Sequence, residues 1–445
     1  MRRGGRAARF QEAMAPGCRG IGTALPQINR LHRRDVRLLF VTRFVRMFAY
    51  GLLSVLLVLY LARLGLRETK IGLLLTLTLV GDIGVSLWLT TTADRFGRRR
   101  TLVVGAALML LAAAVFALTN NFALLVLAAA IGVISPSGNE VGPFLSVEQA
   151  ALSQVIPEQR RTYVFGWYSL IGSLATATGA LVSGAFTQAL QNAGVPAVSS
   201  YRGVVWVYAG AGLVLGLLFL TLSKAVEITP REGAGAQTGG VRDFLGLHRS
   251  RGVVVKLSAL FSLDAFAGGF VIQSIVAYWF HVRFGVQPVM LGGIFFGANI
   301  LAAVSALAAA KLAARIGLIN TMVFTHLPSN VLLIAVPLMP NVHLAIAMLL
   351  LRFSISQMDV PIRQSYLMAV VEADERSAAA GVTGVARSVG AAISPSLAAL
   401  FLASPALIAG PFFVAGGLKI VYDLLLYRSF ATAQSRTGGQ GNRQG

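Results

Sequence analysis

The chain has 445 residues, of which 56% are hydrophobic and only 12% are charged. Soluble domains carry about 25% charged residues, so a water-soluble protein is excluded, and the apolar content excludes a disordered chain. The net charge of +21 would suggest nucleic acid as a partner of a soluble protein. We instead interpret the basic residues as orientation signals at the ends of membrane spans and expect no nucleic-acid binding.

The first 36 residues form a tail rich in arginine and small residues. The tail has no apolar segment followed by a cleavage site, so we expect no cleavable signal peptide. Translation can start at Met1 or at Met14, because either start leaves the first apolar run intact. The one cysteine, Cys18, allows no intramolecular disulfide.

Apolar runs long enough to span a membrane recur about twelve times, each of roughly 20 residues. They predict an all-α, multi-pass protein with spans at 38–61, 71–93, 101–118, 122–156, 163–190, 201–222, 253–280, 289–316, 319–338, 342–371, 378–402 and 408–427. A stretch rich in Gly, Pro and charge, residues 224–252, reads as a linker. It separates two six-helix halves, 37–223 and 253–430, and a second tail covers 431–445.

Basic residues gather in the loops on one side of these spans. They occupy the turns at 95–100 and 160–161, the linker and both tails, whereas the turns around 120, 340 and 405 carry none. The exceptions on that other side are Arg63, Arg67, Lys70, Arg202 and Arg283. By the positive-inside rule both termini are expected in the cytoplasm. We expect an integral protein of a bacterial inner (plasma) membrane, in contact with membrane lipid and functional as a monomer.

The two halves are related by an internal duplication. A shift of 220 residues along the sequence aligns five residues of the first half with identical residues of the second. Arg63, Gly65, Gly72, Arg95 and Gly97 align with Arg283, Gly285, Gly292, Arg315 and Gly317. A shift of 215 residues continues the match, with Gln149, Leu152 and Arg161 on Gln364, Leu367 and Arg376. Parallel repeats of this kind occur in transporters whose halves rock about a central site.

The turn after the second span reads ADRFGRRR. It resembles the loop pattern G-x-x-x-D-R-x-G-R-R of the major facilitator superfamily of secondary transporters, although Thr90 stands at the first Gly. The matching residues are Asp94, Arg95, Gly97, Arg98 and Arg99. The resemblance covers about 37–430 and implies two pseudo-symmetric halves and a cytoplasmic gating motif that stabilises the outward-facing state. The alternative is a plain basic turn that only sets orientation.

Ionisable residues at membrane depth are costly and usually face the interior of the bundle, which makes them the best site candidates. The candidates for a substrate and proton pathway are Arg43, Arg46, Asp82, Glu140, Glu148, Asp264, Gln273, Arg352, Asp359, Arg363 and Arg387. Glu140 and Asp82 lead as proton carriers. Glu140 follows the Pro- and Gly-rich stretch ISPSGNEVGP, which predicts a broken helix.

Glu148 and Arg363 are equivalent under the 215-residue shift and carry opposite charge. Either they pair across the cytoplasmic side, or each pairs within its own half, Arg363 with Asp359 one turn away. Local pairing is favoured, and a second local pair is expected between Lys419 and Asp423. His326 is interpreted as a packed histidine, and Tyr168 as one of the aromatic residues at the membrane interface.

These features favour a secondary active transporter that moves a small solute by alternating access, with proton-coupled efflux of a drug or metabolite as the preferred direction. Uptake of an organic anion through Arg352 or Arg387 is the alternative. A non-transporting sensor or assembly protein with the same fold is a further one. The sequence has no Walker pattern, HExxH or Cys/His cluster, so we expect no enzyme activity, metal or cofactor.

Overall fold

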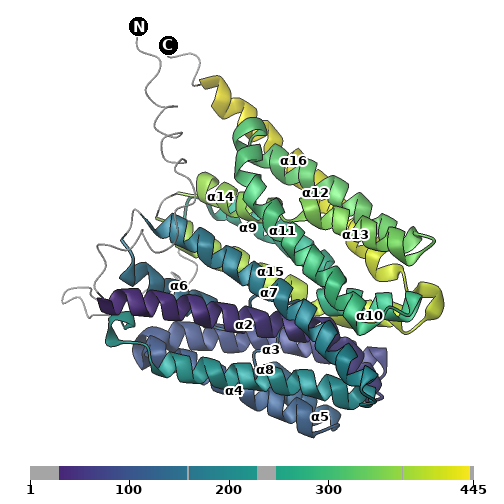
Figure 1. Ribbon diagram of the computed structural model, residues 1–445. Coiled ribbons are helices and arrows are strands. Elements are labelled where there is room, and N and C mark those ends of the chain that lie inside the picture. Colours follow the sequence, from purple (N-terminus) through teal and green to yellow (C-terminus); the bar gives the residue numbers. More distant parts are fainter. Residues whose placement is uncertain (1–29, 158–159, 228–246, 373, 441–445) are drawn as a thin grey trace.

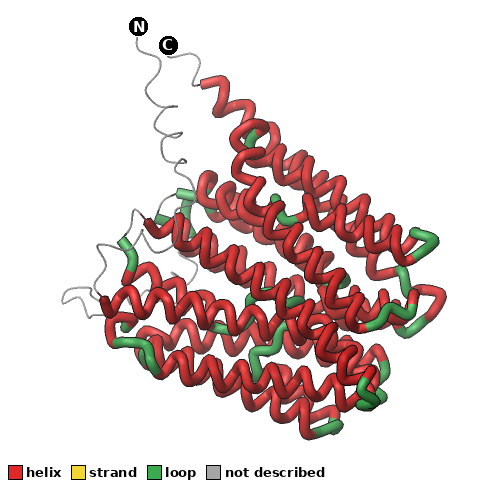
Figure 2. The backbone as a smooth tube through the Cα atoms, in the orientation of Figure 1, coloured by secondary structure: helices red, strands yellow, loops and turns green. Residues whose placement is uncertain are grey.

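The computed structural model describes residues 30–157, 160–227, 247–372 and 374–440, and all their regular elements are helices (Figure 2). The first group is α2 (Arg30–Arg63), α3 (Glu68–Phe96), α4 (Arg98–Leu118), α5 (Phe122–Ile131), α6 (Phe144–Val155), α7 (Arg161–Asn192) and α8 (Ala197–Leu220). The second group is α9 (Arg251–Gly269), α10 (Gln273–Phe284), α11 (Pro288–Ile316), α12 (Leu318–Ala335), α13 (Val342–Ser356), α14 (Asp359–Val370), α15 (Arg376–Leu402) and α16 (Gly410–Gln440). Within the described residues, 11 helical stretches are long and apolar enough to cross a membrane, and α5 is a shorter apolar helix.

The helices run side by side along one direction (Figure 1). We call the end of the bundle where α2 begins and α16 ends the terminal face, and the other end the opposite face. Helices α2 to α8 pack mainly on one another, as do α9 to α16. Between the two groups, α7 packs along α11, α3 along α15, and α2 contacts α10.

Three of the predicted spans are interrupted. The break between α5 and α6 lies in the expected stretch, where Gly138 and Gly142 have φ of 73° and 76°, a backbone conformation that favours glycine. The spans predicted as continuous over 253–280 and 342–371 are each two helices, which corrects the sequence-based expectation. Pro361, in the first turn of α14, lacks the N–H that a continuous helix would use and would clash with the carbonyl one turn earlier.

The groups touch most closely near the opposite face. A Cβ atom added at Gly184 of α7 would clash with the carbonyl oxygen of Pro288, and one added at Gly72 of α3 would clash with the Cβ of Ala399. Tyr278 donates a hydrogen bond to Glu68 at 2.9 Å. Small residues therefore allow the backbones of the two groups to approach closely at this end.

A carboxylate caps the start of α9 at the terminal face. Glu375 accepts hydrogen bonds from the backbone N–H groups of His248, Arg249 and Ser250 at 2.5, 2.8 and 2.9 Å. Burial disfavours its ionised form, but these hydrogen bonds outweigh burial and lower the pKa of Glu375 from 4.5 to about 2. The cap connects the loop before α15 to the first helix of the second group.

We predict that replacing Gly184 by alanine destabilises the protein, whereas the same change at Gly166 on the same helix does not. Overpacking at Gly184 costs about 1–3 kcal/mol. At Gly166 a Cβ atom would have open space within 4 Å, and alanine there gains about 1 kcal/mol of helix propensity. Thermal unfolding of both variants in detergent measures the difference. Equal midpoints for the two variants would contradict the close contact.

We predict that Glu375→Gln lowers thermal stability at pH 7 and that this difference is smaller at pH 3. Because the pKa is lowered in the folded chain, the stabilisation is complete above about pH 4.5. It is lost as the pH falls toward 2. Unfolding midpoints at pH 7 and pH 3 test this, with the exposed neighbour Asp374→Asn as the control. A Glu375→Gln effect of equal size at both pH values would oppose the cap.

Candidate functional site

An ionic cluster lies in the first group, where α2 faces α6 and α7. Arg46 donates to Glu148 at 2.7 Å and to Glu140 at 3.3 Å, and Arg43 also pairs with Glu140. Arg46 and Glu148 are fully buried. Positions 43 and 46 are three residues apart and therefore share one face of α2.

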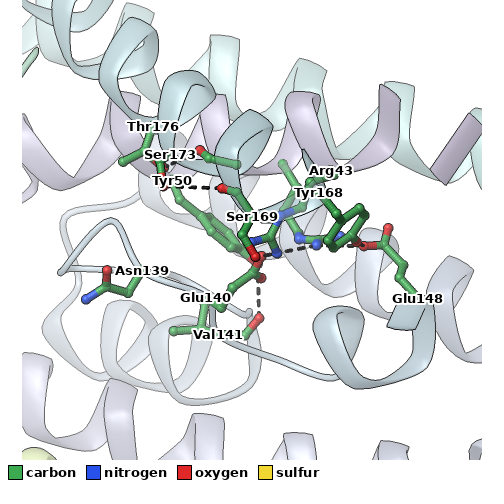
Figure 3. Close-up of polar contacts among 12 residues, drawn as sticks. Arg43, Tyr50, Asn139, Glu140, Val141, Glu148, Tyr168, Ser169, Ser173 and Thr176 are labelled. Atoms are coloured by element: carbon green, nitrogen blue, oxygen red, sulfur yellow. Dashed lines mark hydrogen bonds and ion pairs between the residues drawn. The ribbon is translucent and has the colours of Figure 1, made fainter. Parts of the chain in front are cut away.

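Tyr168 of α7 belongs to this cluster (Figure 3). Its hydroxyl donates to Glu148, its ring lies 4.7 Å from the guanidinium of Arg43, and it is fully buried. Its assignment to the membrane interface was therefore wrong. Thr42 also donates to Glu148, at 2.8 Å. The sequence analysis missed Tyr168 and Thr42 as partners of Glu148, because the spacing of residues along the sequence does not show which side chains of different helices meet.

Asp82 of α3 lies apart from these arginines. It accepts a hydrogen bond from the N–H of Gly142 at 2.6 Å and one from Ser86 at 3.3 Å. The first bond ties α3 to the broken segment between α5 and α6. Asp82 therefore satisfies part of the backbone that the break leaves free.

A second ionic cluster lies in the second group. Asp264 of α9 accepts from Arg363 at 2.9 Å and from Lys419 at 2.5 Å, and Arg363 also contacts Asp359 at 3.2 Å. All four are buried. Arg363 thus pairs within its own half, as Glu148 does, and the two do not meet.

His326 and Asn330 of α12 complete this cluster. Asp423 contacts His326 Nδ1 at 2.8 Å and accepts from Asn330 at 2.9 Å. The expected local pair of Lys419 with Asp423 is wrong: α12 occupies both oxygens of Asp423, and Lys419 extends to Asp264 on α9 instead. Spacing along one helix identified both charges but not their partners across helices.

The two clusters correspond under the duplication with their charges exchanged. In the first group, the first helix supplies the cation Arg46 and α6 the anion Glu148. In the second, the first helix supplies the anion Asp264 and α14 the cation Arg363. Each pair connects the first helix of its group to the second segment of an interrupted span, α6 in the first group and α14 in the second.

The remaining pathway candidates lie in different surroundings. Gln273, at the break before α10, donates to Ser54 of the other group at 2.7 Å and accepts from Asn299 at 3.2 Å. Arg352 and Arg387 are half-buried on α13 and α15. The ion pairs of the described residues include neither arginine, and Arg352 stacks on Phe353 at 5.0 Å.

The expected gating motif forms a tight turn at the terminal face. Gly97 has a φ of 95°, and Glu227, which the sequence analysis missed, accepts from the N–H groups of Arg98 and Arg99 at 2.7 and 3.1 Å. The side chain of Arg98 donates to Gln154 of α6 at 2.6 Å. The turn thus connects α4, α6 and the segment after α8. The side chains of Asp94 and Arg95 lie outside the described residues.

The sequence matches the Major Facilitator Superfamily over residues 39–395, and the chain belongs to this family. An uncharacterized membrane protein of Saccharomyces cerevisiae, YJR124C, is 31% identical over 92% of this chain and 97% of its own length. The quinolone resistance protein NorA of Staphylococcus aureus is 25% identical over 45% of this chain and 46% of its own length.

A crystal structure of a bacterial homologue of the human lysosomal transporter Spinster, in an inward-facing and unoccupied conformation, superposes with a TM-score of 0.66. The match covers 91% of this chain and 96% of that one at 14% identity, so it shows the fold. The chain is therefore a multi-pass membrane protein with the transporter fold of the superfamily, as its loop motif implied.

We predict that Glu148→Gln destabilises the protein strongly, because it leaves the fully buried Arg46 with only its longer contact to Glu140, at 3.3 Å. Breaking one side of a buried pair costs about 3–5 kcal/mol. The double variant Arg46→Met with Glu148→Met should recover most of that loss, since the remaining charges, Arg43 and Glu140, pair with each other. Thermal unfolding of the single and double variants measures both effects. A stable Glu148→Gln protein would contradict the importance of this pair.

Proposed function

We propose that this protein is a secondary active transporter that moves a small solute by alternating access. The observation that carries the proposal is the distribution of contacts. The two groups pack closely near the opposite face, while each interior ion pair of the described residues lies within one group. Two units of this kind can rock against each other without breaking an ion pair between them, which is how parallel repeats expose a central site to alternate sides.

The terminal face is placed in the cytoplasm of a plasma (inner) membrane. Basic residues of the turns at 95–100 and 160–161 lie at this face, as the positive-inside rule requires. With this orientation, close packing at the opposite face corresponds to an inward-facing state. The Spinster homologue, which is inward-facing, has a similar fold.

The solute site is placed where the two groups meet in the middle of the bundle. Gln273 bonds to Ser54 across the groups there, and the N–H of Ser274 donates to the carbonyl of Pro136 at 3.3 Å. Both segments are breaks in helices, and irregular backbone at membrane depth is tolerated where it lines a cavity or is buried in protein. Polar groups from both units therefore converge on one place.

We propose proton coupling, with Asp82 as the better of the two expected carriers. Glu140 is held by two arginines, Arg43 and Arg46, which stabilise its ionised form. Among the described residues, Asp82 bonds only to the neutral groups Gly142 and Ser86, and no ion pair of these residues holds it in its ionised form. Efflux of a drug-like compound is the proposed direction, supported by the partial similarity to NorA, a quinolone resistance protein.

Uptake of an organic anion remains the second candidate. The observation in its favour is that Arg352 and Arg387, both half-buried, have no carboxylate partner among the described ion pairs, and a cation at membrane depth favours a bound anion. The turn formed by the expected gating motif would serve either direction, by holding α4 and α6 together as the terminal face closes. The remaining alternative, a non-transporting sensor with the same fold, would move no solute at all.

The proposed function is tested in liposomes that contain the purified protein and a trapped pH-sensitive dye. Cationic, neutral and anionic drug-like solutes are added under a proton gradient. We predict solute-dependent proton movement that falls at least about tenfold in Asp82→Asn, whereas Asp374→Asn, an exposed acid, leaves it unchanged.

Each outcome separates the candidate functions. Movement that survives in Asp82→Asn but disappears in Glu140→Gln would transfer the role to Glu140. Response to anions alone would favour the uptake candidate, and solute flux without proton movement would exclude coupling to protons.

A further inference from the structure

His326 lies between two carboxylates and contacts each with a different ring nitrogen. Its Nδ1 lies 2.8 Å from an oxygen of Asp423, and its Nε2 lies 3.8 Å from an oxygen of Asp264. The three residues come from α12, α16 and α9, and all are buried. A histidine with a carboxylate at each nitrogen can bind a proton that both carboxylates stabilise.

The charged groups around His326 come from five helices. The helix α16 supplies Lys419 and Asp423, with the ring of Tyr422 at 5.8 Å, and α9 supplies Asp264. On α14, Asp359 and Arg363 contact each other, and Arg363 contacts Asp264. Arg352 of α13 and Arg387 of α15 interact with Asp264 and Asp359 at longer range.

Charge balance singles out Asp423 within this cluster. Asp264 is in contact with two permanent cations, Arg363 and Lys419, and Asp359 with one of them. Within the part of the chain that the structure describes, the polar partners of Asp423 are His326 and the neutral Asn330. An uncompensated carboxylate is costly at this depth, so a proton shared with His326 is its natural counter-charge.

The position of Asp264 connects this pair to the movement of the two groups. Asp264 lies on α9, which ends at Gly269, and the chain then reaches Gln273, the residue bonded to Ser54 of the other group. A rearrangement at this junction would shift α9 relative to α12 and α16. The 3.8 Å separation between His326 and Asp264 is too long for a hydrogen bond, and a shift of α9 would close it.

We propose that His326 and Asp423 form a proton-binding site, and that proton binding draws α9 toward α12. In the neutral imidazole the Nδ1–H group donates to ionised Asp423. A proton from solvent forms an N–H bond at Nε2, and the resulting imidazolium attracts the ionised Oδ1 of Asp264. Lys419 holds the same oxygen, so the two cations compete for it. The proton-binding site itself does not depend on the proposed function; only the role of this site in coupled transport rests on that function.

The test measures whether conformation depends on pH through His326. The full chain with Cys18→Ser carries spin labels at Tyr163→Cys and Ile316→Cys, two exposed positions on α7 and α11 near the terminal face. Distances between the labels are recorded at pH 8 and pH 5.5 in lipid nanodiscs. We expect the ratio of the short-distance to the long-distance population to change at least about twofold between the two pH values.

His326→Gln, which keeps a hydrogen-bond donor for Asp423, and Asp423→Asn should each abolish this change. The matched control is His343→Gln, an exposed histidine at the start of α13, which should retain it. A labelled chain without any pH-dependent change, or a change that survives in His326→Gln, would overturn the inference. A change that requires His326, together with no solute-dependent proton movement in liposomes, would support the site and reject the proposed coupling.

Discussion

The cost of placing charge in a membrane interior is the constraint on which the rest of this structure depends. Arg46 and Glu148 are fully buried and bond to each other at 2.7 Å, and Asp264 is held by Arg363 and Lys419. Removing one partner of such a pair costs several kcal/mol. Because each pair lies within one group of helices, neutrality is preserved even when the groups change their relative position.

The exchange of charges between the clusters shows that neutrality, and not the sign of a particular position, is what the duplicated architecture requires. Glu148 and Arg363 are equivalent under the 215-residue shift, yet each joins its broken helix to the first helix of its own group. Two pseudo-symmetric halves can therefore keep the same support with opposite polarity. The second group goes further, because its cluster also includes His326 and Asp423.

Local signals in the sequence predicted the parts of the fold that depend on local chemistry. Apolar length predicted the spans, and the prolines and glycines of ISPSGNEVGP predicted the break before α6. The break before α14 was missed although Pro361 signalled it. Residue spacing did not predict the partners that come from other helices, because these depend on three-dimensional packing. Examples are Tyr168 for Glu148, Lys419 for Asp264, and Glu227 for the turn at Arg98.

The contacts between the groups differ in kind from those within them. Across the groups, Gln273 bonds to Ser54, and Ser396 donates to Thr76 at 2.8 Å; these are bonds between neutral groups, each with a net worth of about 1 kcal/mol. Close contacts at Gly184 and Gly72 add packing that is lost over a small separation. The ion pairs of the described residues lie inside each group, whereas hydrogen bonds and close packing join the groups, including the bond from Tyr278 to the carboxylate of Glu68 near the opposite face. Such contacts open at lower cost than a buried ion pair, and the proposed rocking of the two groups requires that division of bond strengths.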